Sequence, residues 1–245
     1  LHPIPRRQRQ MCIRDSLHEA DSLTRLFINY GPTVQVKNPS KDVEILHSWR
    51  STKVWDKPVI VLVNKYSASA SEIFAGAMQD YKRGIVIGQT TFGKGSVQRF
   101  KTTSNGQIKL TDSLYYRITG LPTQLYGVQP NLEIPSLLSD DVLGEGEYEN
   151  AIKPNSIDDA FYITYQNIDS DSLEKSFEQR INDSKYFSKI DEIKNQRDSN
   201  LFLSLNLEER KIIKESDRKN TLELVNFGRM LSGKEKFSNF SDYEQ

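Results

Sequence analysis

The stretch PVIVLVNKYSASASEIFAGAMQDYKRGIVIGQTTFGKGSVQ, residues 58–98, decides the predicted fold of the chain. It opens with a short apolar run, PVIVLVN, and contains a second one, GIVIGQ, at residues 84–89. Such runs are typical of strands that are covered on both faces. Between them, the apolar residues 73, 74, 77, 78 and 81 recur at the spacing of one helix face. The order strand, helix, strand predicts a βαβ unit with two parallel strands.

On both sides of this unit the pattern predicts further helix and strand. Residues 17–28 carry apolar side chains at helical spacing, which predicts a short amphipathic helix. Residues 33–37 and 43–49 are expected to be extended. Residues 96–101 and 107–118, joined through the turn Ser-Asn-Gly, predict an antiparallel hairpin.

A change of composition near Ser139 predicts a domain boundary. Residues 140–150 are acidic and irregular, and beyond them glycine almost vanishes while charged amphipathic patterns extend from about residue 156 to 232. We therefore expect an α/β (α+β) core over residues 17–138 and a mainly helical domain over residues 139–245. The last residues show no helix C-cap, so we expect this second domain to be truncated.

The composition excludes several classes of function. Lysine plus arginine and aspartate plus glutamate both total 33, without a long block of one sign, so neither a nucleic-acid groove nor an anionic membrane surface is expected. The longest apolar run, Val59 to Val63, is too short to cross a bilayer. The single cysteine, Cys12, rules out an internal disulfide and a multi-cysteine metal site. We expect no metal and no cofactor.

The first sixteen residues, LHPIPRRQRQMCIRDS, differ from the rest of the chain. They are arginine-rich, have no usable periodicity and lack the apolar segment of a signal peptide. The run MCIRDS resembles the translation of a transposon end used to prepare sequencing libraries. We expect residues 1–16 to be a non-native leader, and a basic disordered arm is the alternative.

Three serines alternate at residues 67, 69 and 71, where the first predicted strand gives way to the helix. A serine hydroxyl is a poor nucleophile at neutral pH and needs a base within hydrogen-bond reach. Histidine is the usual base, but the chain has only His2, His18 and His47, none of them in a turn signature. A Ser-His-Asp triad through His47 remains an alternative.

The other candidate base is Lys94, which stands between two glycines in TTFGKGSV, residues 90–97. A lysine with the ordinary pKa near 10.4 is neutral in only about one molecule in a few thousand at pH 7. A lysine base therefore needs desolvation and the absence of a close carboxylate. No acidic residue occurs between Asp80 and Asp112, which favours such a setting.

The expected geometry agrees with this chemistry. Parallel α/β folds expose functional groups where a buried strand ends, and the amides of a helix N-terminus can stabilise an oxyanion there. An extended segment from Lys94 to Gln98 would place Lys94, Ser96 and Gln98 on one face. Gln98 could then hold the lysine without adding a charge. A purely structural explanation stays open at this point, in which Ser67 caps the helix and Lys94 is a turn residue.

Residues 61–98 resemble the active-site region of the tail-specific proteases, also called C-terminal processing peptidases, of peptidase family S41. The resemblance extends from LHEADSLTRLFINYGPTVQV through GVQPNLEIP and SIDDAFY into the charged C-terminal region. It implies a serine endopeptidase with a Ser–Lys dyad on a crotonase-like (ClpP-like) core. The roles that it implies are Ser69 as nucleophile, Lys94 as general base, Gln98 as its orienting partner, the Ala70 amide as oxyanion donor and Asp80 as a supporting residue.

The same resemblance implies protein substrates with apolar C-terminal tails, an adaptor lipoprotein as a possible partner and a periplasmic location. Two features of the family are missing from the chain: the glycine-rich segment that supplies a second oxyanion amide, and the tail-binding PDZ module. We therefore expect residues 1–245 alone to be nearly inactive. The alternatives are a non-catalytic peptide-binding scaffold and a crotonase-type acyl-CoA enzyme on the same core.

Overall fold

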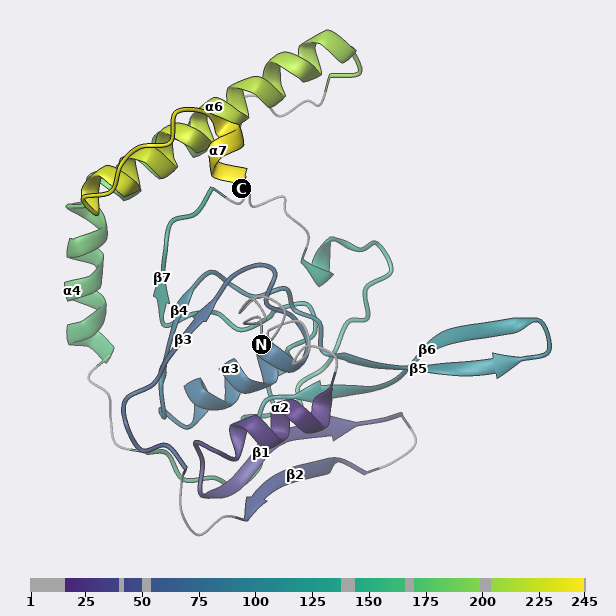
Figure 1. Cartoon of the computed structure of the whole chain (residues 1–245). Coiled ribbons are helices and arrows are strands. Elements are labelled where there is room, and N and C mark those ends of the chain that lie inside the picture. The colour runs from purple at the N-terminus through teal and green to yellow at the C-terminus, as the bar shows by residue number, and fades with distance from the viewer. Residues whose placement is uncertain are drawn as a thin grey trace, which may run out of the picture. The chain divides into compact units, whose positions relative to one another are not determined.

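The computed structural model describes residues 16–39, 42–49, 54–137, 144–165, 170–198 and 204–244 (Figure 1). The predicted leader, apart from residue 16, lies outside the described residues, as do residues 138–143 at the predicted boundary. The described chain divides into two compact units. The first comprises residues up to 134 together with 140–174, and the second comprises residues 135–139 and 175–245.

The predicted βαβ unit is confirmed. Strand β3 (Ile60–Val63) pairs in parallel with β4 (Ile85–Gly88), and helix α3 (Ala70–Asp80) connects them. The short strand β7 (Leu132–Glu133) adds to the other side of β4, which gives a parallel sheet of order β3-β4-β7.

The expectation that β3 is covered on both faces is wrong. This strand forms the edge of its sheet, and the side chains of Ile60 and Leu62 are 62% and 72% exposed. The alternate residues Val61 and Val63 pack with Val86 of β4. A continuous apolar run shows only that each of its residues can be buried. Whether both faces of the strand are covered depends on which other elements pack against it, and the run itself does not show this.

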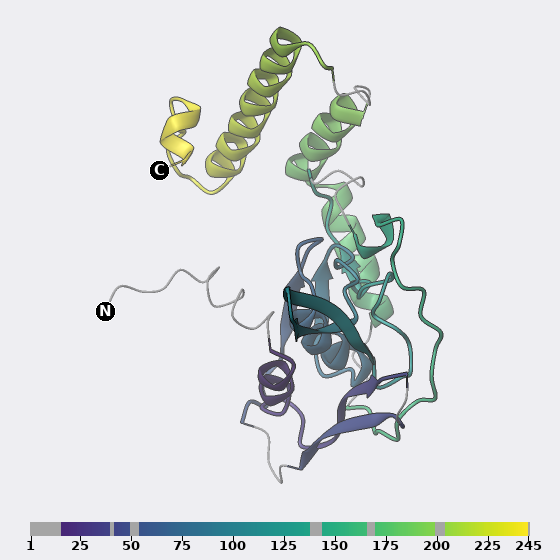
Figure 2. The same cartoon turned by 90° about the vertical axis from the view of Figure 1, so that its right-hand side faces the viewer.

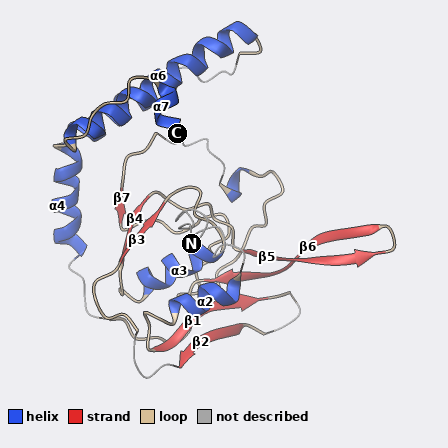
Figure 3. Cartoon of the chain, in the orientation of Figure 1, coloured by secondary structure: helices blue, strands red, loops and turns tan. Residues whose placement is uncertain are grey.

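A second sheet is antiparallel and has the order β2-β1-β6-β5. Its strands are β1 (Tyr30–Lys37), β2 (Glu44–Trp49), β5 (Ser96–Thr103) and β6 (Gly106–Tyr116). The predicted hairpin is confirmed, because β5 pairs with β6 along the whole of β5, from Ser96 opposite Leu114 to Thr103 opposite Gly106. Its outer part extends as an exposed two-stranded arm (Figure 3).

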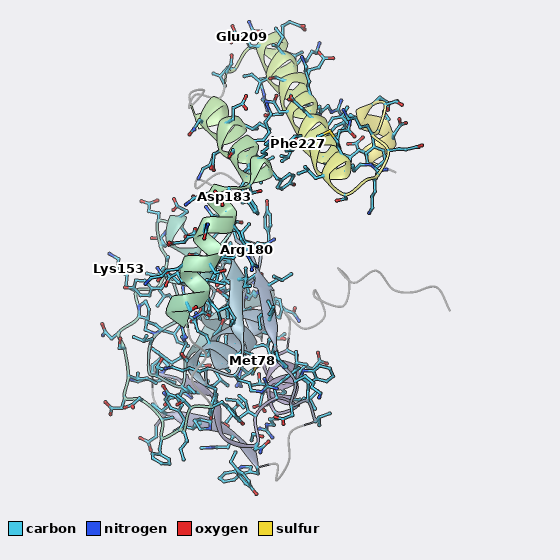
Figure 4. All side chains as sticks on the ribbon, turned by 90° about the vertical axis from the view of Figure 1, so that its left-hand side faces the viewer. Met78, Lys153, Arg180, Asp183, Glu209 and Phe227 are labelled. Atoms are coloured by element: carbon cyan, nitrogen blue, oxygen red, sulfur yellow. The ribbon has the colours of Figure 1, made fainter. Side chains whose placement is uncertain are left out.

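Helix α3 packs against both sheets. Near its start, Ala70 and Ile73 share a cluster with Val34 of β1 and Tyr115 of β6. Further along, Ala75 packs against the parallel sheet, in a cluster with residues of β3 and β4. Met78 is fully buried in a third cluster, inside the core (Figure 4). Because α3 is held on several sides, the turn at its N-terminus has a fixed position. Helix α2 (Leu17–Thr24), predicted over residues 17–28, packs beside it.

The helical character predicted for the C-terminal part is confirmed, although the helices begin later than expected. They are α4 (Ser170–Asn182), α5 (Lys185–Asp198), α6 (Leu207–Leu231) and α7 (Phe240–Glu244), and α6 is the long continuous helix in Figure 2. A 3₁₀ turn, η1 (Glu145–Glu147), precedes them, and residues 151–165 have no helix or strand. In the second unit, Ile190 and Ile193 of α5 pack against Leu224 of α6.

Candidate active site

Ser69 occupies a strained turn between β3 and α3. Its backbone has φ 60° and ψ −122°, a conformation that residues other than glycine rarely adopt and that costs about 1–3 kcal/mol. The Ser69 N–H donates to the Glu72 carboxylate over 2.6 Å, and the Ser69 carbonyl accepts from the Glu72 N–H over 2.8 Å. A sharp strand-to-helix turn of this kind is how α/β hydrolases expose a nucleophilic serine. Backbone strain maintained by specific bonds is typical of functional sites.

The two neighbouring serines bond to local backbone. The Ser67 hydroxyl accepts from the Asn64 N–H over 3.1 Å, and the Ser71 hydroxyl donates to the Ala68 carbonyl over 2.8 Å. The N–H of Ala70, the first residue of α3, donates to no acceptor in the described part of the chain. A free amide at a helix N-terminus, next to a candidate nucleophile, can serve as an oxyanion donor.

The glycines on both sides of Lys94 have a packing reason. Gly93 has φ +87°, and a Cβ there would lie 2.9 Å from the carbonyl carbon of Leu125. A Cβ at Gly95 would lie 2.5 Å from the backbone nitrogen of Gln124. The lysine loop therefore runs so close to residues 124–127 that only glycine fits on either side of Lys94.

Glu72 is a component of the site that the sequence analysis missed. It is fully buried, and its two carboxylate oxygens together accept four hydrogen bonds. One oxygen accepts from the Thr91 hydroxyl and from the Gly93 N–H over 2.7 Å. The other accepts from the N–H groups of Ser69 and Lys94, over 2.6 and 3.0 Å. One buried carboxylate thus connects the serine turn to the lysine loop.

Two opposing effects act on the protonation of Glu72. Burial raises the pKa of the Glu72 carboxyl above its ordinary 4.5, and the donated hydrogen bonds act in the opposite direction. The sequence signal for this residue is the spacing Ser-x-x-Glu, in which a glutamate three residues after the N-cap reaches back to the N-cap amide.

Tyr115 of β6 forms a second connection between the same two segments. Its buried hydroxyl lies 2.9 Å from the Ser69 carbonyl oxygen and is also hydrogen-bonded to the Lys94 carbonyl. Burial, with the nearby Glu72 carboxylate, raises the pKa of the Tyr115 hydroxyl well above 10. The hydroxyl therefore keeps its proton and acts as a donor. Glu72 binds the amides of Ser69 and Lys94, and Tyr115 binds their carbonyls.

Lys94 lines a cavity of about 610 Å³. Ser96 and Gln98 line the same cavity, although the extended segment expected over residues 94–98 begins only at Ser96, the first residue of β5. Ser69 is not among the lining residues, and within the described residues no hydrogen bond joins its hydroxyl to the Lys94 amine. The lining set is Phe92, Lys94, Ser96, Gln98, Thr111, Glu145, Tyr148, Glu149, Asn150, Ala151 and Ile152.

The acid-free surroundings expected for Lys94 hold along the sequence but not in space. Glu72 accepts a hydrogen bond from the Lys94 amide, and Glu145 and Glu149 line the same cavity. None of these carboxylates forms an ion pair with the Lys94 amine among the residues that the structure describes. The neighbours of Lys94 in sequence do not show this, because Glu72 lies on α3, before the lysine loop, and Glu145 and Glu149 lie about fifty residues further along the chain.

Asp80 lies at the other end of α3 from Ser69, about 16 Å along the helix axis. It forms a two-point ion pair with Arg117, and their side chains are only 4% and 15% exposed. Burial raises the pKa of the Asp80 carboxyl, while the neighbouring guanidinium acts in the opposite direction. This geometry gives Asp80 a role in packing α3 and none in proton transfer at Ser69.

His47 has no contact with the serine turn. It lies in β2, at the edge of the antiparallel sheet, and stacks on Trp49 with ring centroids 5.0 Å apart. No hydrogen bond connects it to Ser69 within the described ranges. The triad alternative therefore has no support from the geometry.

Two family models together match almost the whole chain beyond residue 14. Peptidase family S41 matches residues 15–134, and the C-terminal domain of tail specific protease matches residues 138–245. The chain belongs to peptidase family S41. The first matched range, residues 15–134, includes both the serine turn and the lysine loop.

The chain is also similar to individual proteins of known name. The tail-specific protease of Haemophilus influenzae is 34% identical over 93% of this chain, which spans 35% of that protein. The carboxy-terminal-processing protease of Bartonella bacilliformis is 39% identical over 56% of this chain and 33% of its own length. Among solved structures, the photosystem II D1 C-terminal processing protease is 30% identical, with a TM-score of 0.46, over 52% of this chain and 33% of its own. The chain thus spans about a third of these relatives.

In the part of the chain that the structure describes, every helix is too short or too polar to cross a membrane.

Proposed function

We propose that this S41 chain carries the catalytic residues of a serine endopeptidase, with Ser69 as nucleophile and Lys94 as general base. The observation that carries the proposal is the pair of connections through Glu72 and Tyr115. They hold a strained serine at a helix N-terminus beside the single lysine of a glycine-bracketed loop. A packing role alone requires neither the strained backbone at Ser69 nor two buried polar side chains devoted to the same two residues.

The proposed chemistry needs only groups of this chain and the substrate. The neutral Lys94 amine takes the proton from the Ser69 hydroxyl as its oxygen attacks the peptide carbonyl carbon. The negative charge that develops on the carbonyl oxygen is stabilised by the Ala70 N–H. The lysine ammonium then protonates the departing amine, and water releases the acyl group in the reverse sequence. Gln98, in the same cavity as Lys94, orients the amine without adding a charge, and Asp80 supports α3.

Substrate and location are proposed from the family resemblance. We infer protein substrates with apolar C-terminal tails, a possible adaptor lipoprotein and a periplasmic site of action. From the same resemblance we infer that the second oxyanion amide and the PDZ module lie outside residues 1–245. Loss of one oxyanion donor lowers kcat by about 10²–10³. We therefore propose that the 245-residue chain alone cleaves such substrates very slowly.

The test uses the complete protein encoded by the gene that contains this sequence, hereafter the complete gene product. A fluorophosphonate probe should label Ser69, and the label should be lost in Ser69→Ala and in Lys94→Met. Ser71→Ala is the matched control, because its hydroxyl bonds to the Ala68 carbonyl, and it should keep the label. Labelling that persists in Lys94→Met would exclude Lys94 as the base. Tail-peptide binding without any label would favour the non-catalytic scaffold.

A further inference from the structure

A segment from the region of the second family model forms one wall of the cavity at Lys94. Residues 144–152, here called the strap, contribute Glu145, Tyr148, Glu149, Asn150, Ala151 and Ile152 to the lining. The family model of the catalytic region ends at residue 134, so the strap lies outside it. In the structure, however, the strap belongs to the same compact unit as Lys94.

The first turn of the strap is fixed to the lysine loop by a buried amide. The Gln124 side chain, which has no exposed surface, accepts from the Gly95 N–H and donates to the Glu145 carboxylate, both over 2.8 Å. The Glu145 N–H also donates to the Phe92 carbonyl over 2.8 Å. The strap is thus attached to residues on both sides of Lys94, and its glutamates keep a defined position relative to the base.

The charges of this cavity are unbalanced. Among the described residues, its acidic and basic lining residues are Lys94, Glu145 and Glu149. A lysine that acts as a general base is neutral at the moment of attack, which leaves two carboxylates without a lining cation. Glu145 is bonded to Gln124, whereas Glu149 is exposed and has no hydrogen bond or ion pair within the described residues. Tyr148 and Ile152 add carbon surface, which suits the aliphatic stem of a long cationic side chain.

We propose that the strap selects the residues next to the scissile bond by charge, so that lysine, arginine and uncharged side chains are accepted and aspartate and glutamate are disfavoured. This inference rests on the proposed function, because it takes the cavity at Lys94 as the place where the substrate flanks its cleavage point. Like charges brought together at an interface oppose binding, and the effect increases as water is excluded. Selection near the scissile bond would act in addition to selection of the C-terminal tail.

The strap also provides a matched pair of variants. Glu149 lines the cavity, whereas Glu147, two residues earlier, is exposed and does not line it. Glu149→Lys and Glu147→Lys change the net charge of the protein equally, so only a local effect distinguishes them. The substrates are a library of peptides with one common apolar tail and varied residues upstream, and mass spectrometry identifies each cleaved bond.

With the complete gene product, cleavage should occur at sites flanked by basic or uncharged residues about fivefold more often than at sites flanked by acidic residues. Glu149→Lys should remove or reverse this preference, and Glu147→Lys should retain it. An equal profile for the three proteins, or an equal change in both variants, would overturn the inference while leaving Ser69-dependent cleavage intact.

A binding measurement tests the strap even if the proposed chemistry fails. Two fluorescent peptides that differ by lysine or glutamate at one position are titrated into the Ser69→Ala protein. Tighter binding of the lysine peptide, lost in Ser69→Ala combined with Glu149→Lys, supports the inference. Equal affinity of the two peptides, or no binding of either, contradicts it. Absence of Ser69-dependent cleavage by the unmodified protein would instead contradict the proposed function.

Discussion

Replacement of Glu72 by glutamine is the most direct test of how the serine turn and the lysine loop are held together. The substitution keeps the size and shape of the side chain but replaces one acceptor oxygen with an NH₂ group that only donates. Glu72 accepts from four donors, two at each oxygen. Whichever way the new amide is oriented, two donors face an NH₂ group, either those of Ser69 and Lys94 or those of Thr91 and Gly93.

The expected cost follows from those two lost acceptors. A buried donor left without a partner costs about 1–3 kcal/mol, so two cost about 2–6 kcal/mol. Part of this is offset because the variant no longer buries a negative charge. We expect Glu72→Gln to lower the free energy of unfolding by about 3 kcal/mol near neutral pH. Glu147→Gln, an exposed glutamate, should change it by less than about 0.5 kcal/mol.

Urea unfolding of the 245-residue chain measures this cost. Tryptophan fluorescence is the suitable signal because both tryptophans, Trp49 and Trp55, lie in the first compact unit together with Glu72. In the complete gene product, kcat should fall about 10² while KM changes little, because misplacing a reacting group by about 1 Å has that effect. Equal urea midpoints and equal kcat for Glu72→Gln and the unmodified protein would refute the bridging role of this carboxylate.

Four further predictions follow from the same contacts. Tyr115→Phe keeps the ring but loses the hydroxyl, so it should cost about 1 kcal/mol of stability and lower kcat more than it raises KM. Gly93→Ala should cost more in urea unfolding than Gly233→Ala, by about 1–3 kcal/mol, because both have positive φ but only a Cβ at Gly93 meets another backbone. Asp80→Asn leaves the Arg117 guanidinium without its carboxylate and should cost about 3 kcal/mol, with kcat of the folded enzyme retained. The pH dependence of stability should differ between the unmodified chain and Glu72→Gln. Burial raises the pKa of folded Glu72 above 4.5, so between pH 4.5 and that raised pKa the folded chain binds a proton that the unfolded chain has released. The unmodified chain should therefore gain stability relative to the variant as pH falls toward 4.5.

Much of the fold was predictable because its signals are local. The βαβ unit follows from two apolar runs and one helical stripe, and the β5–β6 hairpin follows from its turn residues. The exposure of Ile60 and Leu62 was not predictable, because it depends on which strand lies beside β3. The late start of the helices has a similar origin. The Ile157 and Ala160 amides donate to the carbonyls of Gly120 and Ile118, so these amides have partners without a helix.

The candidate site was likewise predictable from the sequence only in part. Ser69 and Lys94 could be singled out because their residue types and their position in the βαβ pattern indicate chemistry. The groups that bring them together are less visible: Glu72 has the spacing of an ordinary capping residue, and Tyr115 resembles any core aromatic of a strand. Their polar ends become significant only when four segments meet at Ser69. The surroundings of Lys94 were inferred from its sequence neighbours, and Glu145 and Glu149 of the strap show why that inference failed.

The presence of these carboxylates sharpens the requirement on the proposed base. Each unpaired negative charge near Lys94 favours its protonated form, which cannot accept the serine proton. Within the described residues, however, Glu72 is fully engaged by four donors and Glu145 is bonded to Gln124. That leaves Glu149 as the exposed carboxylate of the cavity, and a bound cationic side chain of the substrate would neutralise it. On this reasoning, a basic residue beside the scissile bond both neutralises Glu149 of the strap and favours the neutral form of Lys94. Glu149→Gln should therefore raise kcat for peptides with uncharged flanks more than for peptides with basic flanks. An equal effect on both peptide classes would contradict this link between the charge of the substrate and the protonation of Lys94.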